Sequence, residues 1–211
     1  MPSAWWKLTI VVVGLIWLSL SSLAMAGEPT DVVRQITDRV LAVLEDPQWQ
    51  GPDKQAERQQ RLRQISEHAF AWEEMARRAL AVHWRERSPQ ERQEFVQLFR
   101  DLVERTYINR LEQASKEKQD ILYTGERVED ARAVVSTRAV TTRGTEVPLD
   151  YSLIKQNEGW QIYDVRIEGV SLINNYRSQF NDIVRSSSYE NLVQKMRSRD
   201  ESVAAPGEKA R

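Results

Sequence analysis

The chain contains no cysteine and only two histidines in its 211 residues. Without cysteine it can form no disulfide, no thiol nucleophile and no thiolate ligand for a metal. His68 and His83 are too few for a histidine-rich metal site. A chain of this length can still bury a core large enough to fold without disulfides. We therefore expect a protein without a metal centre and without a cofactor.

Neither sign of charge dominates, since 30 Lys and Arg residues face 31 Asp and Glu residues. A nucleic-acid-binding domain should be clearly basic on one face, so this balance argues against that class. The chain also lacks the G-x-S-x-G motif of serine hydrolases, a glycine-rich phosphate loop and the H-E-x-x-H motif of zinc proteases. Basic pairs such as Arg77-Arg78 alternate with acids and are interpreted as solvated helix faces.

One long apolar run stands at the N-terminus. Lys7 precedes an apolar stretch from Leu8 to Leu20, and Ala24-Met25-Ala26 has the spacing of a signal-peptidase site. The run covers about 13 residues, whereas a membrane-spanning helix needs roughly 20. We expect residues 1–26 to be a cleaved signal peptide, residues 27–196 a single domain, and the charged residues 197–211 a disordered tail.

The first half of the mature chain has helical spacing of apolar residues. Helices are predicted over Thr30 to Leu44, Lys54 to Glu67 and a stripe from Trp72 to His83. Ser88-Pro89-Gln90-Glu91 has the residues of a capping box with proline at the first helical position. It should open a long helix that reaches Ala114.

After Lys118 the apolar period changes from 3.6 to 2. Strands are predicted over Asp120 to Thr124, Arg132 to Thr141, Glu146 to Gln156 and Trp160 to Ile167. Short polar turns separate them, which favours an antiparallel meander of four strands that ends at Gly169. Helical spacing then returns from Leu172 to Val184 and from Tyr189 to Met196. The predicted class is α+β, with helices packed around a curved four-stranded antiparallel sheet.

Three groups are candidates for chemistry. Asp164 and Glu168 share one face of a strand, but four residues of strand place them roughly 13 Å apart. That separation is too long for two carboxylates acting on one atom, so we interpret them, with Arg166, as a solvated face. His83 is interpreted as a histidine at the core or its rim. Catalysis by Asp164 or His83 in a small α+β hydrolase or isomerase remains an alternative.

Three blocks of residues resemble the MlaC family, also called the toluene-tolerance periplasmic lipid-binding family. The first runs from Trp72 to Leu80 and continues with His83-Trp84-Arg85; the second runs from Ser88 to Phe95 and continues with Leu98-Phe99. The third comprises Trp160 to Val165, Glu168 to Leu172, Asn175-Tyr176-Arg177 and Phe180. The resemblance covers Leu62 to Met196 in order. It departs at Ala81, where the family often has glycine, and we interpret this alanine as compatible with a helix.

The resemblance implies a sheet and helices that enclose a deep apolar pocket for the acyl chains of a glycerophospholipid. It implies a soluble periplasmic carrier, monomeric and without enzymatic activity, whose bound phospholipid is cargo. The partners it implies are an outer-membrane lipoprotein–porin complex and an inner-membrane ABC transporter, in support of outer-membrane lipid asymmetry. An interaction module with a filled core remains a further alternative, because composition does not separate a packed core from a cavity.

The apolar faces of the predicted elements supply the residues for such a pocket. The residues expected to bind lipid are Leu80, Phe95, Phe99, Tyr107, Val135, Val147, Leu149, Tyr151, Leu153, Tyr163, Val165, Ile167, Val170, Leu172, Ile173 and Tyr176.

Overall fold

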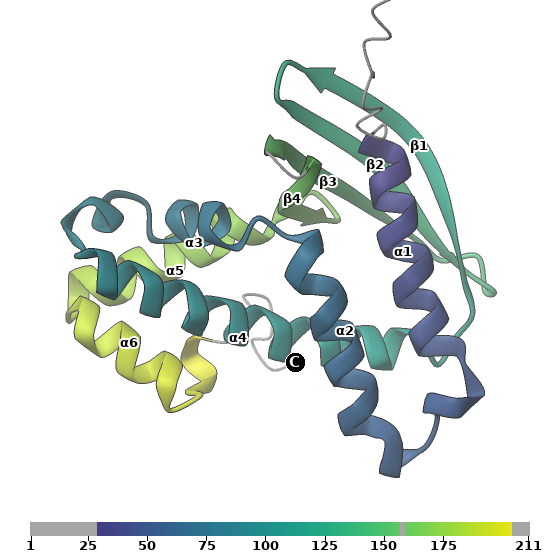
Figure 1. Cartoon of the computed structure of the whole chain (residues 1–211), viewed down its shortest axis with the longest axis horizontal. Helices are drawn as coiled ribbons and strands as arrows, with labels where there is room; N and C mark the ends of the chain where they lie inside the picture. The colour runs from purple at the N-terminus through teal and green to yellow at the C-terminus, as the bar shows by residue number, and fades with distance from the viewer. Residues whose placement is uncertain (1–28, 157–158, 204–211) are drawn as a thin grey trace, which may run out of the picture.

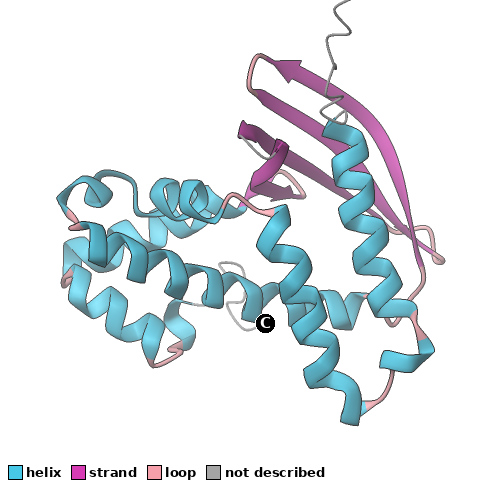
Figure 2. Cartoon of the chain, viewed as in Figure 1, coloured by secondary structure: helices cyan, strands magenta, loops and turns pink. Residues whose placement is uncertain are grey.

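The computed structural model describes residues 29–156 and 159–203, so the predicted signal peptide lies outside the described residues. The architecture is α+β, as predicted (Figures 1 and 2). The helices are α1 (Pro29–Glu45), α2 (Gln55–Ala69), α3 (Trp72–Leu80), α4 (Pro89–Ala114), α5 (Leu172–Ser186) and α6 (Tyr189–Arg197). Short 3-10 segments are η1 (Pro47–Trp49), η2 (Pro52–Lys54), η3 (Ala81–Glu86) and η4 (Glu201–Val203).

Within the described residues, the sheet has five antiparallel strands in the order β1-β2-β3-β4-β5, one more than predicted. They are β1 (Gln119–Glu129), β2 (Arg132–Thr141), β3 (Glu146–Gln156), β4 (Gly159–Ile167) and β5 (Val170–Ser171). Figure 1 shows that the sheet is curved and open and that α1 lies across it.

The additional strand corrects the expectation that the ladder ends at Gly169. Ile167 pairs with Val170, so Glu168 and Gly169 form a two-residue hairpin turn. Both have positive φ, 51° and 80°, as a tight turn with the twist of the flanking strands requires. Gly169 therefore reverses the chain, and the ladder continues for two residues before α5 begins.

The chain does not continue as one helix from Trp72 to His83. α3 ends at Leu80, and Ala81 follows with φ 51° and ψ −120°. An alanine with this backbone is strained, because its Cβ crowds the main chain where glycine would not. The interpretation of Ala81 as a helical residue was therefore wrong, and His83 lies in η3 instead.

The helix predicted from the capping box is confirmed at both ends. The Ser88 hydroxyl accepts a hydrogen bond from the Glu91 amide, and the Glu91 carboxylate accepts one from the Ser88 amide. Both bonds satisfy amides that have no partner inside the helix.

Three clusters of buried apolar side chains form the interior of the described part of the chain. A helical core joins α3, α4, α5 and α6 around an aromatic cluster in which Phe99 meets Tyr176 and Phe180 edge-to-face. A second core lies between α1 and the sheet and contains Val33, Val135 and Leu153. A third, smaller cluster joins α1, α2 and the second half of α4 through Leu44, Leu62 and Ile108, and these side chains border the space between those helices and the sheet.

The structure describes the charged C-terminal stretch as far as Val203. Arg197 ends α6, η4 follows, and the side chain of Val203 is fully buried against the helical core. The Lys195 ammonium also donates to Asp200, 3.0 Å away. The buried Val203 and the ion pairs of Lys195 with Asp200 and of Arg197 with Glu94 thus hold this stretch against the helices, and residues 204–211 lie outside the described residues.

Candidate functional site: an apolar cavity under the sheet

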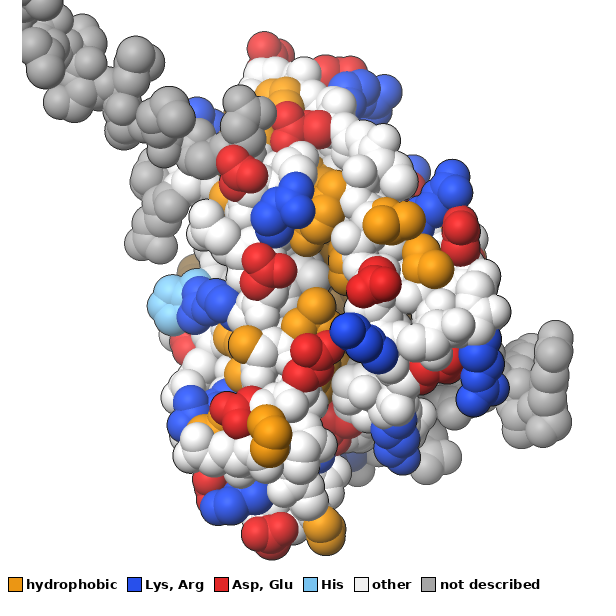
Figure 3. Space-filling view, turned by 90° about the vertical axis from the view of Figure 1, so that its right-hand side faces the viewer, with side chains coloured by type: hydrophobic (Ala, Val, Ile, Leu, Met, Phe, Trp, Pro, Cys, Tyr) orange, Lys and Arg blue, Asp and Glu red, His pale blue; other side chains and the backbone are white. Residues whose placement is uncertain are grey.

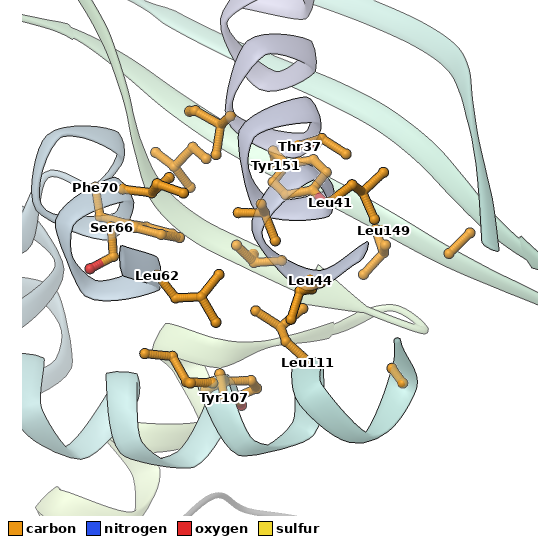
Figure 4. Close-up of a pocket in the computed structure, with 18 of the residues that line it drawn as sticks. Thr37, Leu41, Leu44, Leu62, Ser66, Phe70, Tyr107, Leu111, Leu149 and Tyr151 are labelled. Carbon is orange, nitrogen blue, oxygen red and sulfur yellow. The ribbon is translucent and has the colours of Figure 1, made fainter. Parts of the chain in front are cut away.

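A cavity of about 290 Å³ lies between the sheet, α1, α2 and α4 (Figure 4). Its wall is formed almost entirely by carbon atoms from aliphatic and aromatic side chains. The volume falls near the lower end of the ~300–1,000 Å³ that small-molecule pockets span. Such a site favours a ligand with long apolar chains, because few polar groups converge on it.

The structure brings several of the predicted residues together in this wall: Tyr107, Leu149, Tyr151, Val165, Ile167 and Leu172. Four elements supply them, since Tyr107 comes from α4, Leu149 and Tyr151 from β3, Val165 and Ile167 from β4, and Leu172 from α5. In Figure 4 the side chains of Leu149 and Tyr151 point from the sheet toward α1. That these residues contact lipid stays a prediction.

The other predicted residues lie outside the wall. Leu80, Phe95, Phe99, Ile173 and Tyr176 are buried in the helical core, Val135 and Leu153 are buried between α1 and the sheet, and Tyr163 packs partly buried against the helical core. Val147 is partly buried on β3, and Val170 is 57% exposed on β5. On α4, the predicted residues separate by position along the helix. The first half of α4 packs against α5 and α6 in the helical core, and its second half lines the cavity.

The sequence prediction missed the contribution of the first two helices. The stripe of α1 and one face of α2 line the cavity through Val33, Ile36, Val40, Leu41, Leu44, Leu62 and Ile65. The helical spacing of this stripe was visible in the sequence. What the sequence did not reveal was its partner, because an apolar stripe looks the same whether it faces a sheet, a helix or a cavity.

A β-bulge in β4 places Ile162 and Asp164 on opposite faces of the strand. Ser152 pairs with Asp164 and Leu153 pairs with Ile162, so Tyr163 is an extra residue on β4. A bulge interrupts strict alternation. Ile162 and Val165 consequently both face the cavity, and Asp164 turns to the opposite side.

Asp164 is buried there and holds the start of α5. Its Oδ2 accepts a hydrogen bond of 2.6 Å from the Ser171 hydroxyl, and its Oδ1 accepts one of 3.0 Å from the Ile173 amide. The interpretation of Asp164 as a solvated side chain was therefore wrong. His83 also has a hydrogen-bond partner, because its Nε2 lies 3.2 Å from Oδ1 of Asn181.

One buried carboxylate, that of Glu104, lies in the cavity wall. The Arg100 guanidinium donates to it at 2.9 Å, the Ser66 hydroxyl donates to it from α2, and Arg63 lies 3.8 Å away. These contacts neutralise the charge and fasten α2 to α4. Glu104 therefore supports the wall and leaves it effectively apolar.

The face of the molecule shown in Figure 3 is hollowed along its middle. Apolar side chains are visible in the hollow, and charged side chains of both signs flank it. This face is the side of the molecule on which α1 and β1 lie in Figure 1. At the cavity edge, Leu111 of α4 lines the wall and is still 41% exposed, so the cavity reaches the surface.

Within residues 29–156 and 159–203, no helix is long and apolar enough to cross a membrane. No group of three or more histidine, aspartate or glutamate side chains in the same part of the chain is arranged to hold a metal ion.

Comparisons with known proteins place the chain in a family. A solved structure of the phospholipid-binding protein from Ralstonia solanacearum, in complex with a phospholipid, superposes with a TM-score of 0.73. It is 26% identical and covers 84% of this chain and 99% of its own. No curated protein matches the chain. The model of the MlaC protein family matches residues 34–198, most of the chain, and the chain therefore belongs to the MlaC family.

Proposed function

We propose that this protein is a carrier that holds a glycerophospholipid with its acyl chains in the cavity under the sheet. The apolar wall of that cavity is the observation that carries the proposal. Membership in the MlaC family supports it, as does the similarity to a protein whose solved structure contains a phospholipid. The residues proposed to contact the chains are those of the predicted set in the wall, together with the stripe of α1.

The energetics of an acyl chain fit a carrier. Each buried methylene contributes about 0.8 kcal/mol, so two ordinary acyl chains represent roughly 20 kcal/mol relative to water. Release into water would therefore be negligible on a biological timescale. Since cavity and bilayer are both apolar, transfer between them is nearly neutral, and it must occur while the carrier is docked to a donor or an acceptor.

The route proposed for this transfer runs across the periplasm. The signal peptide expected in residues 1–26 would export the chain, and the domain proposed for residues 27–196 would act as a monomer. It would exchange phospholipid with an outer-membrane lipoprotein–porin complex and an inner-membrane ABC transporter, and so maintain the lipid asymmetry of the outer membrane.

A carrier requires neither a catalytic residue nor a cofactor, and the two candidates for catalysis have structural partners. Asp164 accepts hydrogen bonds from Ser171 and Ile173, and His83 contacts Asn181. Neither lies in the cavity wall. These positions favour the carrier over a hydrolase or isomerase, with phospholipid as cargo.

Mass spectrometry of bound lipid tests the proposal. The protein is purified without detergent, extracted with organic solvent, and analysed before and after incubation with phospholipid vesicles. We expect co-purified phospholipid, or phospholipid acquired from the vesicles. Absence of phospholipid under both conditions would sink the proposal.

A further inference from the structure

The cavity is elongated, and its long axis follows α4. Residues of its wall occur along this helix from Val103 to Ala114. Helical geometry makes this stretch roughly 16 Å long. In Figure 4, Ser66 lies toward one end of the cavity, Leu111 toward the other, and Tyr107 between them. The cavity therefore has two ends, one beside Val103 and one beside Ala114.

The end beside Val103 is closed. Four side chains line the cavity and also belong to the helical core, so they form a partition between the two, here called the end wall: Trp72, Met75, Val103 and Leu172. Met75 is fully buried. The indole of Trp72 is held in place, because its Nε1 donates a hydrogen bond of 3.2 Å to the Ser66 carbonyl and its ring contacts the Phe70 ring. The end wall therefore has the packed helical core directly behind it.

The opposite end is open and polar. Leu111 and Ala114 of α4 line the cavity there and are exposed, and the next wall residues along the chain are Ser115, Glu117 and Gln119. An acyl chain is stabilised by leaving water, whereas a charged headgroup loses its hydration if it is buried. A phospholipid therefore fits this cavity with its headgroup at the open end and the terminal methyl group of a chain toward the end wall.

The distance between the two ends is close to the length of one acyl chain. The hydrocarbon core of a bilayer is ~30 Å thick, so each ordinary chain spans about half of it, about 15 Å. The cavity extends along roughly 16 Å of α4. A longer chain finds no further space, because the end wall is packed against the helical core. Each methylene group that does not fit would stay in water at the open end, which lowers the affinity about fourfold.

We propose that the end wall limits the length of the acyl chain, so that this protein selects phospholipids whose chains are about as long as palmitoyl over phospholipids with longer chains. The terminal methyl group of the chain stops against Met75, whose unbranched side chain fills the space beside the fixed indole of Trp72. This assignment rests on the proposed carrier function and adds to it the class of phospholipid carried.

A competition between two chain lengths tests the assignment. Lipid-free protein is incubated with vesicles that contain equal amounts of dipalmitoleoyl- and dieicosenoyl-phosphatidylcholine, and the ratio of the two bound lipids is measured by mass spectrometry. The two lipids share one headgroup and differ in chain length. Because the ratio is measured within one sample, it does not depend on how much of the protein is folded.

Three truncations of buried side chains are compared with the wild type. Met75→Ala shortens a side chain of the end wall, and Val103→Ala is a milder truncation of the same wall. Met196→Ala is the matched control, because Met196 is buried in the helical core and does not line the cavity. It should lower stability in the same way as Met75→Ala and leave the cavity unchanged.

The expected pattern separates chain selection from stability. The wild type should favour the palmitoleoyl lipid by at least about fourfold, which corresponds to one methylene group left in water. Met75→Ala should bring the two lipids close to equal binding, because the space of the missing side chain admits the end of the longer chain. Val103→Ala should shift the ratio in the same direction by a smaller factor, and Met196→Ala should keep the ratio of the wild type.

Three results would overturn the assignment. If the wild-type protein binds neither lipid, both the carrier function and the length limit fail. If it binds both lipids equally well, or if both end-wall variants keep its ratio, only the length limit fails. If Met196→Ala shifts the ratio as much as Met75→Ala does, a looser helical core accounts for the change and the end wall does not select the chain. Should Met75→Ala not fold, Val103→Ala decides between these outcomes.

Discussion

The Ser171 hydroxyl donates a hydrogen bond of 2.6 Å to Oδ2 of Asp164, and this buried contact fastens the end of the sheet to the start of α5. The same hydroxyl accepts a hydrogen bond from the Asn174 amide and so caps α5. A residue that looked like a candidate acid in the sequence therefore positions a helix. Leu172, the first residue of that helix, lies in the cavity wall.

Replacing Asp164 with asparagine should lower stability. The amide nitrogen cannot accept the Ser171 hydrogen bond, and bonds to a buried charged acceptor contribute about 1.5–3 kcal/mol. We expect a loss of about 2 kcal/mol in the free energy of unfolding, measured by urea denaturation. Asp120→Asn, at an exposed residue of β1, should change nothing, and an equally stable Asp164→Asn variant would contradict the role of this contact.

Replacing Ala81 with glycine should raise stability. Ala81 has φ 51°, and a strained backbone of this kind costs on the order of 1–3 kcal/mol, which exceeds the extra entropy of unfolded glycine. We expect a gain of about 1 kcal/mol in urea unfolding. Ala42→Gly, in the interior of α1, should have the opposite sign, and a loss of stability in both variants would refute strain at Ala81.

Replacing Val170 with glutamate should reduce phospholipid binding without unfolding the protein. Val170 pairs with Ile167, and paired residues point to the same face of a sheet, so Val170 lies at the rim beside a residue of the cavity wall. A carboxylate there would have to stay hydrated next to an acyl chain. Lipid content after vesicle incubation is the measurement.

The matched control is Val82→Glu, since Val82 is 69% exposed on η3 in the helical part of the molecule. It should bind as much phospholipid as the wild type. Equal binding by the two glutamate variants would show that Val170 does not border the lipid.

Alkaline pH should destabilise the lipid-free protein partly through Tyr151. Burial, and secondly the nearby phenol of Tyr123, raise the pKa of Tyr151 to about 12. Between pH 10 and 12 the folded protein keeps a proton that the unfolded chain releases, so this contribution is complete below pH 10 and is lost as the pH rises. The slope is about 1.4 kcal/mol per pH unit. Urea denaturation across this range should show a shallower decline for Tyr151→Phe, and identical slopes would exclude this titration.

The features of the fold that the sequence predicted correctly depend on interactions between residues close in the chain. The capping box at Ser88 depends on residues within one turn, and β2 and β3 lie at their predicted bounds because short turns flank them. The class of the fold followed from the change of apolar period after Lys118. The capping box, the short turns and the apolar period each depend on residues that are close in the chain, so they can be read from one sequence.

The cavity depended on contacts between distant residues. Phe95 and Tyr107 belong to one helix and have the same apolar character, yet one fills a core and the other lines the cavity. The bulge at Tyr163 has no local signature, although it puts Ile162 on the same face as Val165. The glycine that the family often has at position 81 was a sign of the positive φ of Ala81, because glycine adopts positive φ readily.

The contact between acyl chain and cavity wall can be measured directly. The photoreactive residue p-benzoylphenylalanine is placed at Leu149 in one variant and at Val82 in another, and each protein is irradiated after incubation with phospholipid vesicles. The account predicts a covalent adduct with the mass of a phospholipid at position 149 and none at position 82. A folded Leu149 variant that forms no adduct, or equal adducts at both positions, would contradict it.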